Sequence, residues 1–313
     1  MLYGDRDPGD VIHKMNTRKD KYDISGKVHI REGEEKIHAM MEDYEGVIIW
    51  DLPSQIRNKY LKYCFSHSIR CYMSPKISDI ILLGTDRIHL FDTPLLMCRN
   101  QGLSMEQRAA KRVLDIIVSG LGIIVSSPIM LIIAIAVKAY DGGPVFYLQD
   151  RLTYQGKEFR IRKFRSMCVD SEKNGARLAS KHDSRITPVG HVLRNLHLDE
   201  LPQLFNVFMG DMSLVGPRPE RDVIMQEYEQ EIPEFHYRLK VKAGLTGYAQ
   251  VYGKYNTTPY DKLKLDLFYI ENYSFLLDIK LLFMTVKIFF QKEVSEGVDD
   301  NQKNALKDSE DKK

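Results

Sequence analysis

The sequence has 313 residues, which is enough for two modest domains or for one domain with attached segments. Hydrophobic residues make up 43% and charged residues 28%, proportions that are ordinary for a globular protein. The 45 Lys and Arg residues nearly balance the 43 Asp and Glu residues, so the net charge of +2 gives no electrostatic reason to expect a nucleic-acid partner. Four cysteines lack CxxC and metal-ligand spacing, which favours idle thiols over a redox or zinc site: Cys64, Cys71, Cys98 and Cys168.

The first hundred residues alternate strand-like and helix-like stretches. The pattern predicts strands at Gly46–Asp51 and Ile69–Met73, and helices at Ser54–Ser66 and Lys76–Leu83. This order favours a parallel α/β layer that resembles a nucleotide-binding, Rossmann-like fold. The glycines near the start do not match GxGxxG. We therefore expect residues 1–105 to form a structural or regulatory domain rather than a cofactor site.

An apolar stretch of 22 residues without a formal charge, Ile116 to Val137, is the most distinctive feature. At about 1.5 Å per residue it could cross a hydrocarbon core of about 30 Å as one helix. Ser127 and Pro128 fall near its middle, and proline removes a backbone donor and bends a helix. Basic flanks, which favour the cytoplasmic side, lie at both ends: Lys111 and Arg112 before the stretch and Lys138 after it. A single span and a re-entrant segment that returns to the same side both remain open.

Ten short motifs follow one another between residues 108 and 290. They are Lys111-Arg112-x-x-Asp115, Ser127-Pro128, Gly143 to Phe146 (GPVF), Gln149-Asp150-Arg151, Lys163 to Met167 (KFRSM), Asp183-x-Arg185-Ile186-Thr187, Leu198 to Val207 (LDELPQLFNV), Gly210 to Pro219 (GDMSLVGPRP), Gly244 to Val251 (GLTGYAQV) and Asp266 to Ile270 (DLFYI). In this order they closely resemble the bacterial sugar transferase family, the monotopic polyprenyl-phosphate phosphoglycosyl transferases.

The resemblance implies a mainly α (α+β) catalytic domain over residues 106–291, with a re-entrant membrane helix at 113–138. Ser127 and Pro128 would break that helix, and Lys111 and Arg112 would lie at the membrane interface. It implies transfer of a sugar-1-phosphate from a UDP-sugar to undecaprenyl phosphate with release of UMP, as the first membrane step of a polysaccharide or glycoconjugate pathway. The enzyme would lie on the cytosolic face of the bacterial inner membrane, in contact with lipid, and members with this architecture can dimerise.

Asp199 and Glu200 stand at the centre of the longest motif. The residues alone also suit a simpler reading, in which aspartate caps a helix and Pro202 occupies its first turn. By resemblance, Asp199 is the nucleophile that forms an aspartyl-phosphosugar intermediate, and Glu200 holds or orients Mg²⁺. Adjacent carboxylates repel each other unless a cation lies nearby, which supports Mg²⁺ at Asp199 and Glu200.

Phosphoryl transfer also needs positive charge around the phosphate oxygens. Residues that the resemblance places around the phosphates are Lys163, Arg165, Arg194 and Arg218, the last between Pro217 and Pro219. Any one of these cations alone would be interpreted as a solvated surface residue. His191 and His197 lie near the acidic pair, but a general base is not required because phosphate monoesters are largely ionised near neutral pH.

The end of the chain has two parts. Tyr273 to Phe290 is apolar with lysines, which suits either a buried core helix or an interfacial helix. Residues 292–313 mix charges without aromatic residues, so we expect a disordered tail. Two rival classes are a single-span membrane anchor with soluble parts on both sides and a soluble nucleotide-sugar dehydrogenase. The missing glycine fingerprint and the apolar stretch argue against the dehydrogenase.

Overall fold

The computed structural model describes residues 1–18, 20–98, 102–169, 183, 185–253 and 257–289. The predicted tail at 292–313 lies outside these residues. By their contacts the residues form two compact units, Met1–Lys76 and Ile77–Lys313, which are described separately. The expected domain boundary at residue 105 falls inside the second unit. The segment before it joins that unit because Ile77 and Ile80 are part of its core.

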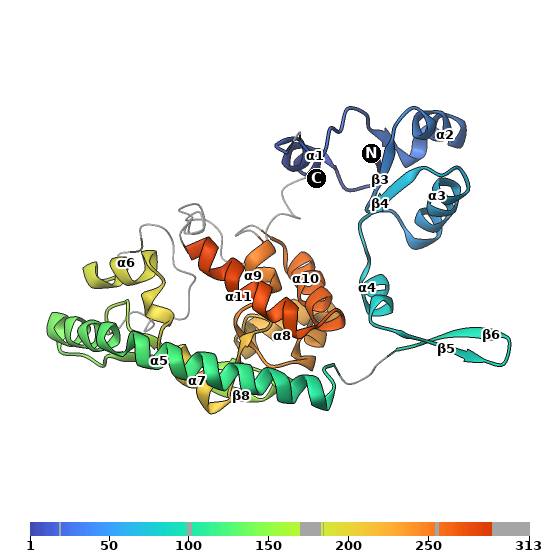
Figure 1. Ribbon diagram of the computed structural model, residues 1–313. Helices are drawn as coiled ribbons and strands as arrows, with labels where there is room; N and C mark the ends of the chain where they lie inside the picture. The colour runs from blue at the N-terminus through green and yellow to red at the C-terminus, as the bar shows by residue number, and fades with distance from the viewer. Residues whose placement is uncertain (19, 99–101, 170–182, 184, 254–256, 290–313) are drawn as a thin grey trace. The chain divides into compact units, whose positions relative to one another are not determined.

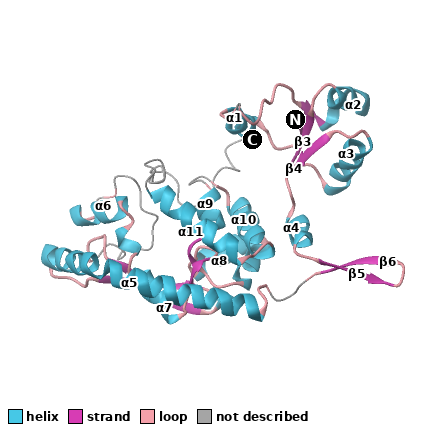
Figure 2. Cartoon of the chain, viewed as in Figure 1, coloured by secondary structure: helices cyan, strands magenta, loops and turns pink. Residues whose placement is uncertain are grey.

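The first unit is an α/β layer built on a four-stranded sheet (Figures 1 and 2). Its elements are β1 (Leu2–Tyr3), α1 (Gly9–Asn16), β2 (Val28–His29), α2 (Glu34–Glu42), β3 (Gly46–Trp50), α3 (Ser54–Ser66) and β4 (Arg70–Met73). The strand order is β2-β1-β3-β4 and all pairs are parallel, which confirms the predicted parallel α/β layer. Both predicted strands and the helix between them are confirmed. Parallel neighbours need crossover connections, which α2 and α3 help to supply.

The second unit is mainly helical with short two-stranded sheets. Its elements are α4 (Ile77–Leu83), β5 (Asp86–Leu90), β6 (Thr93–Met97), α5 (Met105–Asp141), β7 (Phe146–Leu152), β8 (Glu158–Phe164), α6 (Pro188–Asn195), the 3₁₀ turn η3 (Leu198–Glu200), α7 (Gln203–Met209), β9 (Ser213–Val215), α8 (Asp222–Glu231), the 3₁₀ segment η4 (Pro233–Lys240), β10 (Gly244–Thr246), α9 (Tyr248–Tyr252), α10 (Pro259–Glu271) and α11 (Phe275–Phe289). Hairpins pair β5 with β6 and β7 with β8, whereas β9 and β10 pair in parallel. Buried residues of α10 and α11, including Leu263, Leu267 and Leu281, belong to the main core.

Helix α5 contains the predicted membrane segment and has 37 residues. Ser104 and Gln107 form a capping box at its start, and Gly142 ends it in the left-handed conformation at φ 72°. The predicted break at Ser127 and Pro128 does not end the helix. Proline cannot donate to the carbonyl of Ile124, and the Ser127 hydroxyl donates to that oxygen instead at 2.8 Å. The hydroxyl therefore satisfies the acceptor that proline leaves free.

The two faces of α5 differ along its whole length. One stripe is buried against the second unit: Lys111, Asp115, Ser119, Met130, Ile133 and Val137. The opposite face exposes large apolar side chains: Ile117, Leu121, Ile124, Val125, Leu131, Ile132 and Ile135. Among the described helices, only α5 is long and apolar enough to cross a membrane by length and composition. Helix α5 therefore packs lengthwise against the rest of the second unit, which leaves its apolar face uncovered.

Lys111, expected at the membrane interface, has its side chain buried inside the second unit. Its ammonium group is buried, donating to Asp278 Oδ2 at 2.6 Å and to the Tyr269 hydroxyl at 3.0 Å. Arg112 donates to the carbonyls of Val207 and Phe208, both at 2.7 Å, in the last turn of α7. Both cations therefore bind α5 to its own unit, because buried charges and the free carbonyls at a helix end need partners.

Candidate active site

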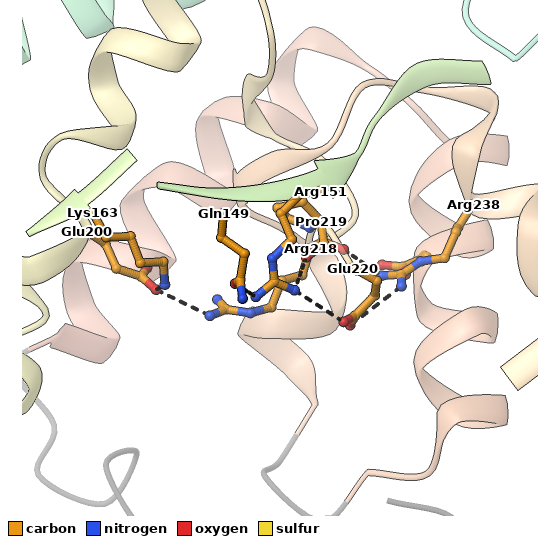
Figure 3. A network of polar contacts seen from close by, with 9 residues as sticks. Gln149, Arg151, Lys163, Glu200, Arg218, Pro219, Glu220 and Arg238 are labelled. Atoms are coloured by element: carbon orange, nitrogen blue, oxygen red, sulfur yellow. Dashed lines mark hydrogen bonds and ion pairs between the residues drawn. The ribbon is translucent and has the colours of Figure 1, made fainter. Parts of the chain in front are cut away.

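Glu200 lies between two cations that come from distant parts of the chain (Figure 3). Lys163, on β8, donates to Glu200 Oε1 at 2.7 Å. Arg218, in the loop after β9, donates to the same oxygen at 3.2 Å. Three of the predicted site residues therefore contact one another. The side chains of Lys163 and Glu200 are each about 20% exposed. This leaves the cluster open enough to meet a ligand.

Asp199 and Glu200 form part of the 3₁₀ turn η3 rather than the first turn of a longer helix. His197 precedes the turn in the left-handed conformation at φ 53°. Helix α7 begins only at Gln203, and its N-cap position is Pro202, without a side-chain cap. The interpretation of Asp199 as a helix cap is therefore wrong. No described residue donates a hydrogen bond to the Asp199 carboxylate, so it remains available to a ligand.

Gly216 and Pro217 are fixed by backbone contacts with the strand pair β9–β10. Gly216 donates to the carbonyl of Thr246, and Gly244 donates to the carbonyl of Pro217, both at 2.8 Å. A Cβ atom at Gly216 would lie 2.3 Å from the carbonyl oxygen of Lys242. Only glycine permits this approach, which sets the direction in which the chain leaves β9 towards Arg218.

Two further arginines hold the carbonyls of Arg218 and Pro219 (Figure 3). Arg238 donates to the Arg218 carbonyl at 3.0 Å, and Arg151 donates to the Pro219 carbonyl at 3.3 Å. Glu220 lies between them, 3.7 Å from Arg238 and 3.8 Å from Arg151. The loop therefore presents the Arg218 side chain to Glu200 from a backbone that is held on both sides.

Arg238 is itself held inside the protein. Its side chain and that of Asp266 on α10 are both buried, and they pair through two contacts at 2.8 and 3.0 Å. An arginine fork can bind a carboxylate and a carbonyl at once, which a lysine cannot do with the same geometry. The pair thus connects the core helix α10 to the loop that carries Arg218.

The two adjacent carboxyl groups have opposite pKa shifts. Burial raises the pKa of Asp199, with a further rise from the negative charge of Glu200 that Lys163 partly offsets. Burial would also raise the pKa of Glu200, but Arg218 and Lys163 outweigh it and hold that pKa well below its usual range. Glu200 in turn raises the pKa of Arg218. Glu200 therefore stays ionised as the partner of the cations, whereas Asp199 is the more basic carboxylate.

Two predicted phosphate ligands have other partners. The buried Arg165 side chain pairs with the partly exposed Asp141 at the end of α5 and donates to the Pro144 carbonyl at 2.7 Å. Arg194, on α6, donates to the Ser166 hydroxyl at 3.0 Å. The described contacts do not bring either guanidinium to Glu200. Arg165 joins β8 to α5, whereas Arg194 lies near enough to lower the pKa of Asp199 through its charge.

The residues present fit Mg²⁺ held partly by substrate. Among the described side chains, no group of three His, Cys, Asp or Glu could hold a metal ion. Both cation contacts of Glu200 use Oε1, which leaves Oε2 without a donor among the described residues. Mg²⁺ commonly uses one or two carboxylates together with waters and phosphate oxygens. Glu200 Oε2 and the Asp199 carboxylate could supply such ligands.

Comparison with known proteins gives a match that spans this site. Residues 106–292, more than half of the chain, match the model of the family described as bacterial sugar transferase. The chain belongs to the bacterial sugar transferase family. This confirms the resemblance seen in the motifs. The matched region contains all of α5 except its first residue, Met105, and every side chain of the site described above.

Curated relatives are similar over much of the same region. A UDP-N-acetylgalactosamine-undecaprenyl-phosphate N-acetylgalactosaminephosphotransferase of Aeromonas hydrophila is 44% identical over 56% of this chain and 43% of its own length. A UDP-glucose:undecaprenyl-phosphate glucose-1-phosphate transferase of Klebsiella pneumoniae is 38% identical over 80% of this chain and 54% of its own. A UDP-glucose:undecaprenyl-phosphate glucose-1-phosphate transferase of Escherichia coli K12 is 40% identical over 65% of this chain and 43% of its own length. The chain thus spans about half the length of these relatives.

The supporting residues of this sugar transferase escaped the sequence analysis. Arg151 and Asp266 stand in motifs that carried the resemblance, but nothing in a motif tells a ligand from a support. Arg238 lies outside every quoted motif, and its contact with Arg218 joins residues 20 positions apart. Only motif membership could have drawn attention to Arg151 and Asp266.

Proposed function

We propose that this sugar transferase moves a sugar-1-phosphate from a UDP-sugar to undecaprenyl phosphate and releases UMP. The names of the relatives support both substrates. The observation that carries the proposal is the pairing of Glu200 with Lys163 and Arg218 beside the unbonded carboxylate of Asp199. This arrangement combines a nucleophile with positive charge for phosphate oxygens.

In the first step, an Asp199 carboxylate oxygen attacks the β-phosphorus of the UDP-sugar. The bond from that phosphorus to the oxygen bridging the two phosphates breaks, and UMP leaves with the electron pair. Asp199 then carries the phosphosugar as an acyl phosphate. Lys163 and Arg218 stabilise the charge on the phosphate oxygens, since positioning and electrostatics dominate phosphoryl transfer.

In the second step, a phosphate oxygen of the lipid attacks the same phosphorus. The acyl phosphate bond breaks, which returns the carboxylate of Asp199 and leaves a polyprenyl-diphosphate-sugar. The lipid phosphate is already largely ionised near neutral pH, so the residues need not remove a proton. Mg²⁺ held at Glu200 and Asp199 would supply further positive charge to the diphosphate.

The position of α5 supports a re-entrant, monotopic association with the cytosolic leaflet of the inner membrane. Near its start, Lys111 binds Asp278, and at its end Asp141 binds Arg165, both within the second unit. A helix that crossed the membrane would carry one of these pairs away from the rest of the unit. The exposed apolar face would instead enter the lipid while both ends remain on one side.

Two exposed cysteines on either side of α5, Cys98 and Cys168, allow a test of this topology. A membrane-impermeant maleimide added outside sealed vesicles should label both cysteines or neither. Which of the two results appears depends only on whether the vesicles are inside-out or right-side-out. Cys64 is buried and serves as the internal control that labels only after unfolding. Labelling of Cys98 and Cys168 from opposite faces would mean that α5 spans the bilayer.

For the first unit we propose a structural or regulatory role. It is a parallel α/β layer, and a Rossmann-like relationship remains our proposal for it. Homodimer formation is likewise a proposal, which the mass of the detergent-solubilised protein would test.

The decisive experiment measures UMP release from a panel of UDP-sugars with undecaprenyl phosphate and Mg²⁺. We expect UMP, with Asp199→Asn lowering the rate about 10⁴-fold or more because the covalent step is lost. With a UDP-sugar alone, mass spectrometry should find a phosphosugar adduct on the peptide that contains Asp199. Release of UDP, or a normal rate for Asp199→Asn, would refute the proposal.

A further inference from the structure

A cleft adjoins the site and shares two of its cations. It opens beside Lys163 and Arg218, and about 260 Å³ of it, counting its solvent-open part, is not filled by atoms. The residues that line it come from β7, β8, α7, the loop after β9 and β10: Arg151, Ile161, Lys163, Gln203, Arg218, Pro219, Gly244 and Leu245. Three of these are cations and none is acidic. The lining therefore suits an anion.

Gln203 is the unusual member of this lining. Its side chain is 3% exposed, yet its amide Nε2 has no hydrogen-bond partner among the described residues. A buried N–H group without a partner costs free energy, so proteins seldom keep one without a ligand, water or strain to explain it. A simple packing role would be filled as well by methionine or leucine.

Arg151 shows the same feature. Its guanidinium donates to Gln149 through Nη2 and to the Pro219 carbonyl through Nη1, but its Nε is buried and has no partner among the described side chains and backbone groups. Two residues of one cleft, from β7 and from α7, thus each have a donor that the protein leaves unused. Burial and the nearby charges of Arg221 and Arg218 lower the pKa of Arg151 to about 10, with Glu220 opposing them. An anion in this cleft would relieve that crowding of positive charge.

We propose that this cleft is a phosphate subsite in which Gln203 and Arg151 donate hydrogen bonds to phosphate oxygens alongside Lys163 and Arg218. The inference rests on the proposed function, which requires two phosphate-bearing substrates. The shared chemistry is a phosphate monoester or diphosphate, from the nucleotide or from the lipid. The amide of Gln203 is uncharged, so it would orient the phosphate through a directional hydrogen bond while the cations supply the positive charge.

The test uses Gln203→Met in the full chain, because methionine keeps the length and packing of the side chain but removes the amide. A hydrogen bond to a charged group is worth enough that its loss should weaken binding about ten-fold or more. Titration calorimetry gives the Kd for UMP, and steady-state rates give the KM for undecaprenyl phosphate. Weaker UMP binding with an unchanged lipid KM assigns the subsite to the nucleotide, and the reverse assigns it to the lipid.

Two controls separate this subsite from general damage. Gln226→Met makes the same change at an exposed position on α8 and should alter neither constant. Gln203→Glu keeps the shape but adds a negative charge, and should weaken the same ligand more than Gln203→Met does. If both Gln203 variants melt like the wild type and bind both ligands within two-fold of it, the subsite is refuted. UMP release by the wild type would still stand, so the failure would not touch the proposed function.

Discussion

Two clusters of opposite charges in the second unit pair a lysine with an acid, and they differ in what surrounds them. Lys111 and Asp278 are sealed in the core, with side chains 7% and 0% exposed, and the Tyr269 hydroxyl donates to Asp278. Lys163 and Glu200 are each about 20% exposed, and Arg218, which shares Glu200, is half exposed. A ligand therefore cannot reach the Lys111–Asp278 cluster, whereas it can reach the Lys163–Glu200 cluster.

The electrostatics of the two acids follow this difference. Burial raises the pKa of Asp278, and its contacts with Lys111 and Tyr269 only partly offset the rise. Glu200 has two cations on one oxygen, and its pKa is lowered despite burial. Around Glu200, two cations face one solvent-accessible carboxylate, and this excess of positive charge suits phosphate binding. The buried Lys111–Asp278 pair has matched charges, which suits the joining of helices α5 and α11. Surroundings, rather than residue type, separate the anchor from the site.

The largest effect on stability should come from breaking the buried pair. Asp278→Leu leaves the Lys111 ammonium buried without its counter-ion, and we expect a loss of about 3–5 kcal/mol in the free energy of unfolding. The double variant Lys111→Met with Asp278→Leu should recover most of it. Denaturant unfolding of the solubilised protein measures both. If the single variant were as stable as the wild type, the pair would not be an anchor.

The corresponding change in the site should affect catalysis more than stability. Glu200→Gln removes the charge that holds Lys163 and Arg218 together, so we expect kcat/KM for UMP release to fall about 100-fold or more, equivalent to about 2.7 kcal/mol. The free energy of unfolding should fall by only about 1–2 kcal/mol, because the cluster is open to water. A variant that lost stability as severely as Asp278→Leu would show that the two clusters do not differ in kind.

A smaller effect should follow from loosening the loop that carries Arg218. Arg238→Lys keeps a charge beside Asp266 but cannot also hold the Arg218 carbonyl in the same geometry. We expect a fall of about ten-fold in kcat/KM with a change in the melting temperature of only a few degrees. Lys264→Arg, on the same helix as Asp266, is a matched exchange that should leave the rate unchanged. Equal rates for Arg238→Lys and the wild type would contradict the positioning role.

The finest test is the pH dependence of the rate. In the proposed mechanism Asp199 must be ionised to attack phosphorus, and its raised pKa should place the acid limb of kcat/KM above the range of an ordinary aspartate. Because Glu200 contributes to the rise, the limb in Glu200→Gln should move to lower pH, whereas Lys163→Met should move it to higher pH. If the acid limb of kcat/KM stayed at the same pH in both variants, the ionisation of Asp199 would not be what sets it.

The same shift has a consequence for folding. A carboxyl group whose pKa is raised in the folded state favours folding while it is protonated, at pH below its unfolded pKa. That contribution is lost as the pH rises through the folded value. Near neutral pH, Asp199→Asn should therefore melt at a higher temperature than the wild type, although we expect it to be inactive. A lower melting temperature would contradict the burial of an unpaired charge at this position.

Much of this protein is determined by short-range patterns in the sequence. Alternating apolar runs predicted β3, α3 and β4, and the uncharged stretch predicted the apolar part of α5, because local propensity and hydrophobic pattern act within a few residues. The motifs identified the family, and the resemblance led to the proposed roles of Asp199, Glu200, Lys163 and Arg218. The residues alone could not decide whether Asp199 was a helix cap or a nucleophile, since a carboxylate three residues before a proline suits both roles.

Only the tertiary structure decided which charged side chain met which partner. The pattern around Lys111 predicts a basic membrane flank, and only the fold brings Asp278, 167 positions away, into contact with it. Arg165, in the same motif as Lys163, pairs with Asp141 rather than with Glu200. The Nε2 donor of Gln203 has no sequence signal, because a glutamine on a short helix is ordinary, and only the fold shows that no described residue accepts from it. A charge or a polar group takes its role from burial and neighbours, and both are set by contacts between residues far apart in the chain.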